Sequence, residues 1–161
     1  MQRYIWETDL RTDDIMNCLS WKVGVHRWLL SPSGEYAIDY VSSPSTPRDI
    51  DLVRIKDAKV ISTLLSAPDP FKSYRMPRIK VGHILAADGK TRLNYRLTLP
   101  PDLDETKKYP TIVYVYGGPK VQLVTGDWQN GARGWDLYMA QRGYVMFTAV
   151  SYTHLRAHET S

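Results

Sequence analysis

The segment Thr111–Pro119, with the sequence TIVYVYGGP, decides the fold class of the second half of the chain. Its residues 111–116 are all β-branched or aromatic, without alternating polar positions. Such a run is typical of a strand that is covered on both faces of a sheet. We therefore expect a central strand at 111–116 rather than an edge strand. Two glycines and a proline follow it at the end where open α/β sheets place their ligands and catalytic groups.

The residues after this strand predict a crossover unit. Helical spacing covers 133–141, where the apolar positions are Trp135, Tyr138 and Met139. Gly143 is placed to end this helix in a left-handed conformation, and 144–149 return to a strand pattern. A strand, a helix and a second strand within about 40 residues favour two parallel strands that are neighbours or near neighbours.

The residues before the strand predict a hairpin and, further upstream, a linker. Residues 79–86 and 92–99 flank Asp88-Gly89, a dipeptide that supplies the positive φ angles of a tight hairpin. Residues 66–77 contain three prolines and have no periodicity, which is typical of a linker between domains. We therefore place a domain boundary near residue 70.

The first half of the chain has the pattern of short β-strands. A hairpin is predicted from 3–8 and 15–19, around a polar turn at 11–14. Four further strands are expected at 26–30, 36–41, 50–56 and 59–65, and their connections are Ser31–Gly34, a loop over 42–48, and a tight turn at Asp57–Ala58. Four antiparallel strands in about 40 residues match one β-propeller blade, with the hairpin as the outer half of the blade before it. The alternative is a free-standing β-meander, which would leave two open edges.

The composition excludes several classes of protein. Lys and Arg number 21 against 17 Asp and Glu, and the two signs are interleaved, so we expect no nucleic-acid partner. The single cysteine, Cys18, excludes an internal disulfide framework and a multi-cysteine zinc site, and we expect an ordinary half-buried thiol there. No segment has the apolar run of a membrane span or of a secretory signal. We expect no cofactor and no metal.

Tyr116 is the candidate catalytic residue. Gly117 and Gly118 allow the backbone to approach a substrate closely, and Pro119 stiffens the exit from the loop. In α/β-hydrolases the loop at this point contributes a donor to the oxyanion hole. A phenol held about 2.7 to 3.1 Å from a developing oxyanion would be such a donor. The alternative is that Tyr116 is a core aromatic residue, as we expect for Tyr114.

Three segments carry a resemblance to a known family: KKYPTIVYVYGGP at 107–119, ADGKT at 87–91 and GVHRWLLSPSGEYAIDYVSS at 24–43. They resemble the dipeptidyl peptidase IV branch of the prolyl oligopeptidase family, and the resemblance covers almost everything before residue 150. It implies a β-propeller joined to an α/β-hydrolase domain, with a Ser, Asp and His triad that removes short peptides from N-termini, commonly after proline. It also implies that the hydroxyl of Tyr116 donates to the oxyanion hole.

The fold implied by the resemblance is mixed: an all-β propeller-blade segment followed by the N-terminal part of an α/β-hydrolase domain. The expected division is one and a half C-terminal blades at 1–65, a linker at 66–77, and the hydrolase part at 78–149. The triad is absent, since Ser31–Gly34 lacks the first glycine and the context of a nucleophile elbow. We therefore expect the chain to be a fragment that is unstable and inactive by itself.

Residues 150–161 do not continue the family pattern and resemble the conceptual translation of a transposon-end sequencing adapter. We interpret this tail as an artefact. His154 and His158 have the i, i+4 spacing of metal ligands, with Glu159 beside them, but a zinc site needs a third ligand in a structural frame. We therefore reject a metal site there. His26 and His83 lie in predicted strands, where we expect structural roles.

Three functions stay open at this point. The first is an exopeptidase that removes dipeptides or tripeptides, with a peptide as its substrate. The second is an acylaminoacyl-peptidase or oligopeptidase of the same superfamily. The third is a noncatalytic propeller and hydrolase-like binding protein. The resemblance is compatible with a homodimer and with a periplasmic, secreted or membrane-attached protein, and decides none of these.

Overall fold

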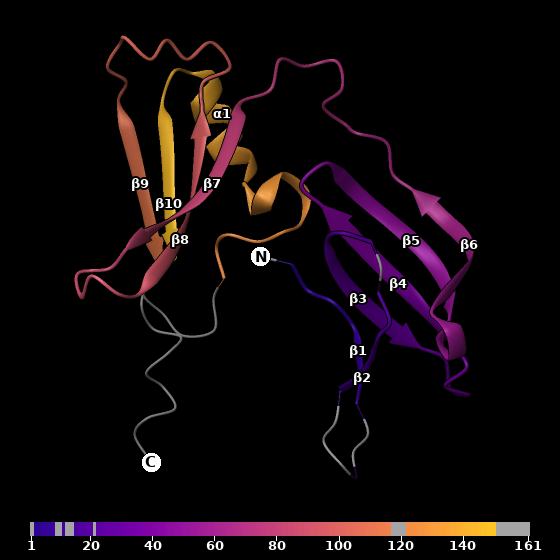
Figure 1. Ribbon diagram of the computed structural model, residues 1–161. Coiled ribbons are helices and arrows are strands. Elements are labelled where there is room, and N and C mark those ends of the chain that lie inside the picture. The colour runs from indigo at the N-terminus through magenta and orange to yellow at the C-terminus, as the bar shows by residue number, and fades with distance from the viewer. Residues whose placement is uncertain (1, 9–10, 12–14, 21, 117–121, 151–161) are drawn as a thin grey trace. The chain divides into compact units, whose positions relative to one another are not determined.

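The chain is described here by a computed structural model that covers residues 2–8, 11, 15–20, 22–116 and 122–150 (Figure 1). The fold is mostly β-sheet with one α-helix. The chain divides into two units. Unit 1 holds the described residues up to Pro70 together with Gly126–Gln129, and unit 2 holds Phe71–Thr125 and the described residues from Asn130 onward. The division falls inside the segment expected to be a linker.

Unit 1 contains a short hairpin and a four-stranded antiparallel sheet. The hairpin pairs β1 (Trp6–Thr8) with β2 (Ile15–Cys18), as the sequence predicts. The sheet has the order β3-β4-β5-β6, and its strands are β3 (Val25–Leu30), β4 (Tyr36–Ser43), β5 (Thr46–Arg54) and β6 (Lys59–Ser66). All four strands were predicted from the alternation of residues. Between β5 and β6, the expected tight turn is a 3-10 helix at Ile55–Asp57, closed by Ala58 in a left-handed conformation.

The turn between β3 and β4 is confirmed. The amide of Gly34 donates to the carbonyl of Ser31 over 3.0 Å, and Gly34 has a φ of 71°. Glycine adopts this left-handed conformation at little cost, whereas a residue with a Cβ would be strained there.

The loop predicted at 42–48 is wrong. β4 continues to Ser43 and β5 begins at Thr46, so the connection is a short hairpin. The strand register shifts between Val41 and Ser43, and a proline is tolerated in a strand at such an irregularity. The hydroxyl of Ser42 also donates to the carbonyls of Thr46 and Pro47, at 3.1 and 2.9 Å. Pro47 therefore lies inside β5 without ending it.

The segment before β1 runs beside β3. Arg3 forms a parallel bridge with Val25: its amide donates to the carbonyl of Gly24, and its carbonyl accepts from the amide of His26, both over 3.1 Å. Gly24 is required at this position, because a Cβ would fall inside contact distance of the Ser42 carbonyl oxygen.

Unit 2 is a mixed sheet with the order β7-β8-β10-β9 (Figure 1). Its elements are β7 (Arg78–Leu85), β8 (Arg92–Leu99), β9 (Thr111–Tyr116), a 3-10 turn whose last residues join this unit (Trp128–Gly131), α1 (Gly134–Gln141) and β10 (Val145–Val150). The β7–β8 hairpin and its Gly89, at a φ of 67°, are confirmed. β9 and β10 are parallel neighbours, which confirms the crossover, and Gly143 ends α1 with a φ of 88°.

The prediction that 111–116 is a central strand is wrong for this chain. β9 lies at the edge of the sheet and pairs with β10 alone among the described strands. Val113 and Val115 remain 61% and 62% exposed. The reason is that α1 packs mainly on β8 and β10, so the described helix covers one face of the sheet at its centre.

The side of helix α1 that faces the sheet also differs from the side that the spacing of its apolar residues predicts. Trp135 and Tyr138 are 56% and 48% exposed, whereas Asp136, Leu137 and Ala140 are buried. The carboxylate of Asp136 faces the sheet because a buried arginine of β8 binds it there.

The fold class is therefore borne out at a coarse level. The β-rich chain is consistent with a propeller-blade segment. A closed propeller is not present among the residues covered, and an α/β-hydrolase domain is not evident from them. No helix in the described ranges is long and apolar enough to cross a membrane.

Candidate functional site

The candidate site begins at the carboxyl end of β9. Tyr116 is the last residue of this strand, lies opposite Val150 of β10, and is 44% exposed. Val113 and Val115 of the same strand are also exposed, so the exposure of Tyr116 is shared along this uncovered edge strand. Gly117, Gly118 and Pro119 lie outside the described residues, so the geometry of the loop that follows is not part of this site.

Tyr114 shares a face of the sheet with Tyr116, because alternate residues of a strand point to the same side. The guanidinium carbon of Arg133 lies 3.9 Å from the centre of the Tyr114 ring. A guanidinium stacked on an aromatic ring at this distance is attracted to the negative face of the ring. The residue before α1 thereby contacts β9 two residues before its end.

Asp136, in the first turn of α1, binds Arg133. Its carboxylate accepts from Arg133 Nη2 over 2.9 Å and from the Arg133 backbone amide over 3.1 Å. Burial by itself raises the pKa of Asp136, but the hydrogen bonds and charge of Arg133, together with the charge of Arg96, leave that pKa below its ordinary value. The bond to Asp136 likewise raises the pKa of Arg133 against the effect of burial. The pair is therefore ionised at neutral pH.

Arg96 of β8 completes the cluster from the sheet. Its side chain is 2% exposed, and Nη2 lies 3.0 Å from Asp136 Oδ2 and 3.4 Å from the hydroxyl of Thr148 on β10. Nη1 donates to the carbonyls of Leu123 and Asn130, both over 2.8 Å. One guanidinium thus ties β8, β10, α1 and the segment before α1 together. We call Arg96, Arg133 and Asp136 the arginine–aspartate cluster.

A glycine lets the segment before α1 fold close to Arg96. Gly131 has a φ of 72°, and a Cβ there would lie 2.7 Å from the hydroxyl of Thr125 and 3.5 Å from Arg96 Nη1. A larger residue would be strained in its backbone and crowded in its surroundings.

The arginine–aspartate cluster holds neighbouring elements in place and does not supply a reacting group. The carboxylate of Asp136 is fully occupied by arginines, so it is unsuited to act as a general base. The one exposed phenol at the end of β9, Tyr116, is suited to donate a hydrogen bond. In the parts of the chain that the structure covers, no cluster of His, Cys, Asp or Glu is arranged to hold a metal ion.

The other residues singled out from the sequence lie elsewhere. His26 is buried in β3, and its Nδ1 and Nε2 lie 2.8 Å from Asp39 Oδ2 and 2.7 Å from the Lys22 carbonyl oxygen. His83 is exposed in β7, and Cys18 is half-buried, as expected. His154, His158 and Glu159 lie outside the described residues.

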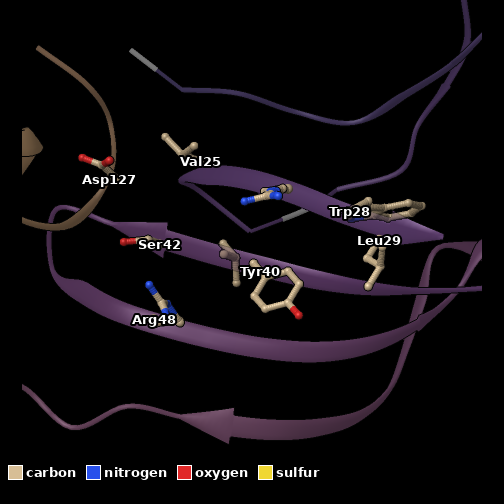
Figure 2. A pocket seen from close by; sticks show the side chains of 9 residues that line it. Val25, Trp28, Leu29, Tyr40, Ser42, Arg48 and Asp127 are labelled. Atoms are coloured by element: carbon tan, nitrogen blue, oxygen red, sulfur yellow. The ribbon is translucent and has the colours of Figure 1, made fainter. Parts of the chain in front are cut away.

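A hollow of about 560 Å³ lies on one side of the unit 1 sheet (Figure 2). Figure 2 shows Leu29 and Tyr40 close together, with Arg48 on the next strand and Ser42 toward Asp127. Leu29 and Tyr40 are 61% and 37% exposed. The hollow therefore combines apolar side chains with the cationic side chains of Arg27 and Arg48.

The sequence analysis missed the arginine–aspartate cluster. A faint signal was present, because Asp136 stands three residues after Arg133 at the start of a predicted helix, the spacing of a capping interaction. Nothing in the sequence pointed to Arg96 as its partner, because the two residues are forty positions apart.

Two of the three comparisons with known proteins found similar proteins. No family model matches the chain. Among curated relatives, dipeptidyl peptidase 4 of Trichophyton rubrum is 32% identical over 104 residues, and that of Arthroderma otae is 34% identical over 103. Each match covers 62% of this chain and 13% of the relative, so the chain spans only a small part of the relatives' length.

Two solved structures resemble most of the chain. A Bacteroides ovatus protein, provisionally assigned as a dipeptidyl aminopeptidase IV, superposes with a TM-score of 0.82 at 48% identity, over 91% of this chain and 21% of that one. Dipeptidyl peptidase 4 of Porphyromonas gingivalis gives 0.81 at 28% identity, over 92% and 21%. The curated relatives and the solved structures thus support a fragment of the dipeptidyl peptidase IV family, one that corresponds to a small part of the length of the proteins it resembles.

Proposed function

We propose that this chain is a segment of a longer serine exopeptidase, here called the parent protein. The parent protein removes dipeptides or tripeptides from peptide N-termini, typically after proline, by forming and hydrolysing an acyl-enzyme. The observation that carries this proposal is the 48% identity, over 91% of the chain, to the Bacteroides ovatus protein. Identity at that level over both units supports a shared activity more strongly than fold likeness alone does.

Tyr116 has the role of oxyanion-hole donor in this proposal. Support comes from its place at the carboxyl end of a strand that runs parallel to its neighbour, and from the exposure of its side chain. When the scissile carbonyl becomes tetrahedral, negative charge develops on its oxygen. A phenol that meets the oxygen at that stage lowers the barrier, because it binds the transition state better than the substrate.

The domain assignment is part of the same proposal. Residues 1–65 are one and a half blades of a propeller, 66–77 a linker, and 78–149 the start of an α/β-hydrolase domain. The antiparallel sheet β3–β6, with exposed Leu29 and Tyr40 on one face, supports a blade that packs against a neighbouring blade. The β9–α1–β10 crossover supports the hydrolase start. The chain by itself is proposed to be inactive, since it encodes no nucleophile elbow.

The test uses the parent protein and a chromogenic dipeptidyl substrate with proline in second position. We expect Tyr116→Phe to lower kcat about 100-fold, the typical effect of losing one oxyanion donor, with little change in KM. Tyr138→Phe is the matched control, because Tyr138 is similarly exposed at 48% but lies on α1. A parent protein that does not release dipeptides would refute the proposal, and release of N-acylated residues instead would favour an acylaminoacyl-peptidase.

A further inference from the structure

The end of β9 is anchored through one side chain. Tyr114 and Tyr116 lie on the same face of the strand, and Tyr114 is the one that Arg133 stacks on, at 3.9 Å. β9 is an edge strand, and among the described strands β10 alone pairs with it. The Arg133 contact therefore adds a second restraint on β9, two residues before Tyr116.

The anchor is itself rigid. Arg133 Nη2 binds Asp136 Oδ1 over 2.9 Å, and Asp136 Oδ2 binds Arg96 Nη2 over 3.0 Å. Arg96 also reaches Thr148, the residue of β10 that lies opposite Tyr114 in the ladder. The contacts thus form a closed circuit from β9 through α1 and β8 to β10 and back to β9.

From this circuit we infer that Arg133 is a positioning residue, which holds Tyr114 and the end of β9 so that the Tyr116 hydroxyl is presented in one fixed place. The inference rests on the proposed role of Tyr116 as the oxyanion donor. Oxyanion stabilisation depends on a preorganised donor, so a looser strand end lowers the rate of the chemical step more than it weakens substrate binding.

Arginine is needed for this task, and lysine does not replace it. The guanidinium is planar and presents a fork of donors, so it stacks on a ring and binds a carboxylate in the same pose. An ammonium group keeps the charge but loses that geometry. Arg133 is also dispensable for the buried pair, because its side chain is 45% exposed and Asp136 keeps its bonds to Arg96 and to the backbone amide of residue 133. Its removal should therefore leave the fold intact.

The experiment measures kcat and KM of the parent protein with the dipeptidyl substrate. We expect Arg133→Ala and Arg133→Lys each to lower kcat about tenfold, with KM unchanged within about twofold. Tyr114→Leu should give the same loss. Arg142→Ala is the matched control, because Arg142 also lies over a tyrosine, at 5.3 Å from the Tyr138 ring, at the other end of α1. It should leave kcat unchanged.

A double-variant cycle separates positioning from a merely structural role. In a Tyr116→Phe background, Arg133→Ala should cause no further loss of kcat, because the hydroxyl that it positions is gone. An equal fold-loss in both backgrounds, or a normal kcat for Arg133→Ala and Arg133→Lys beside an impaired Tyr116→Phe, overturns the role of Arg133 alone. A fully active Tyr116→Phe, or a parent protein without dipeptidyl cleavage, refutes the proposed function and the inference with it.

Discussion

The two units bury their charges in different ways. Unit 1 places His26 beside Asp39, both 5% exposed, on adjacent strands. Unit 2 places Asp136 between Arg96 and Arg133, with the carboxylate fully buried. Each cluster ties several segments of its unit together. Only the first contains a group that titrates near neutral pH.

This difference predicts different responses to pH. Arginine keeps its charge at any working pH, and the lowered pKa of Asp136 keeps its carboxylate ionised until the solution is acidic. A carboxylate whose pKa is lower in the folded state than in the unfolded state stabilises the fold fully at pH values above its unfolded-state pKa. This stabilisation is lost as the pH falls through its folded-state pKa. The unit 2 cluster should therefore weaken only below about pH 4. The His26–Asp39 pair of unit 1 should respond to changes of pH in the neutral range.

The largest expected effect comes from neutralising the centre of the unit 2 cluster. Asp136→Asn leaves Arg96 buried without its counter-charge, which typically costs about 3 kcal/mol or more. In the parent protein, we expect the β8 and β10 amides to lose protection against hydrogen exchange by a corresponding amount. Asp57→Asn is the control: this carboxylate has a pKa lowered to about 2 by hydrogen bonding to Arg54, but the pair is exposed and should not change exchange measurably. An Asp136→Asn protein with wild-type exchange would mean that the cluster is not a structural centre.

The next effect tests the backbone of unit 1. In Gly24→Ala the new methyl group meets the Ser42 carbonyl, and either the strand or the segment before β1 must move. We expect a loss of about 2 kcal/mol in the protection of the β3 and β4 amides. Gly134→Ala in unit 2 is the control, because a Cβ there meets nothing within 4 Å and alanine favours a helix. Equal protection in both variants would show that Gly24 is not needed for close approach.

Local patterns predicted the elements of both units. Alternation identified β3 to β6, turn residues identified the Ser31–Gly34 and Asp88–Gly89 connections, and the crossover over 111–149 followed from spacing. These features depend on residues close in sequence. The loop expected at 42–48 failed because a register shift lets Pro47 stay inside a strand, and a shift of register depends on the partner strand.

The burial of charged residues was not predictable in the same way. In β8, alternation places Arg96 and Thr98 on one face and Leu97 and Leu99 on the other, and polarity alone would turn the first face to solvent. The structure buries Arg96 and Thr98 to 2% and 1% exposure, because α1 covers that face and brings Asp136 to it. Whether such a face is buried depends on a partner that is distant in sequence. The candidate site depends on the burial of this face.

The smallest expected effect is the pH response of unit 1. Both neighbours of the His26 ring accept hydrogen bonds, the Asp39 carboxylate at Nδ1 and the Lys22 carbonyl at Nε2, so the geometry fits a doubly protonated ring. Burial by itself lowers the pKa of His26, but these two hydrogen bonds raise it above its ordinary value, against a smaller opposing effect of the Lys22 charge. That ammonium group lies between Asp49 and Asp51, which hold it in place.

A histidine whose pKa is higher in the folded state than in the unfolded state stabilises the fold fully at pH values below its unfolded-state pKa. This stabilisation is lost as the pH rises through its folded-state pKa. Protection of the β3 and β4 amides, corrected for intrinsic exchange, should therefore decline from about pH 6.5 upward, while that of β8 and β10 stays constant. His26→Gln should remove the pH dependence in unit 1, and His83→Gln, which replaces the exposed histidine of β7, should leave it. If the two units instead lost protection in parallel, the contrast between a titrating pair and a permanently charged cluster would fail, since only His26 distinguishes them in this range.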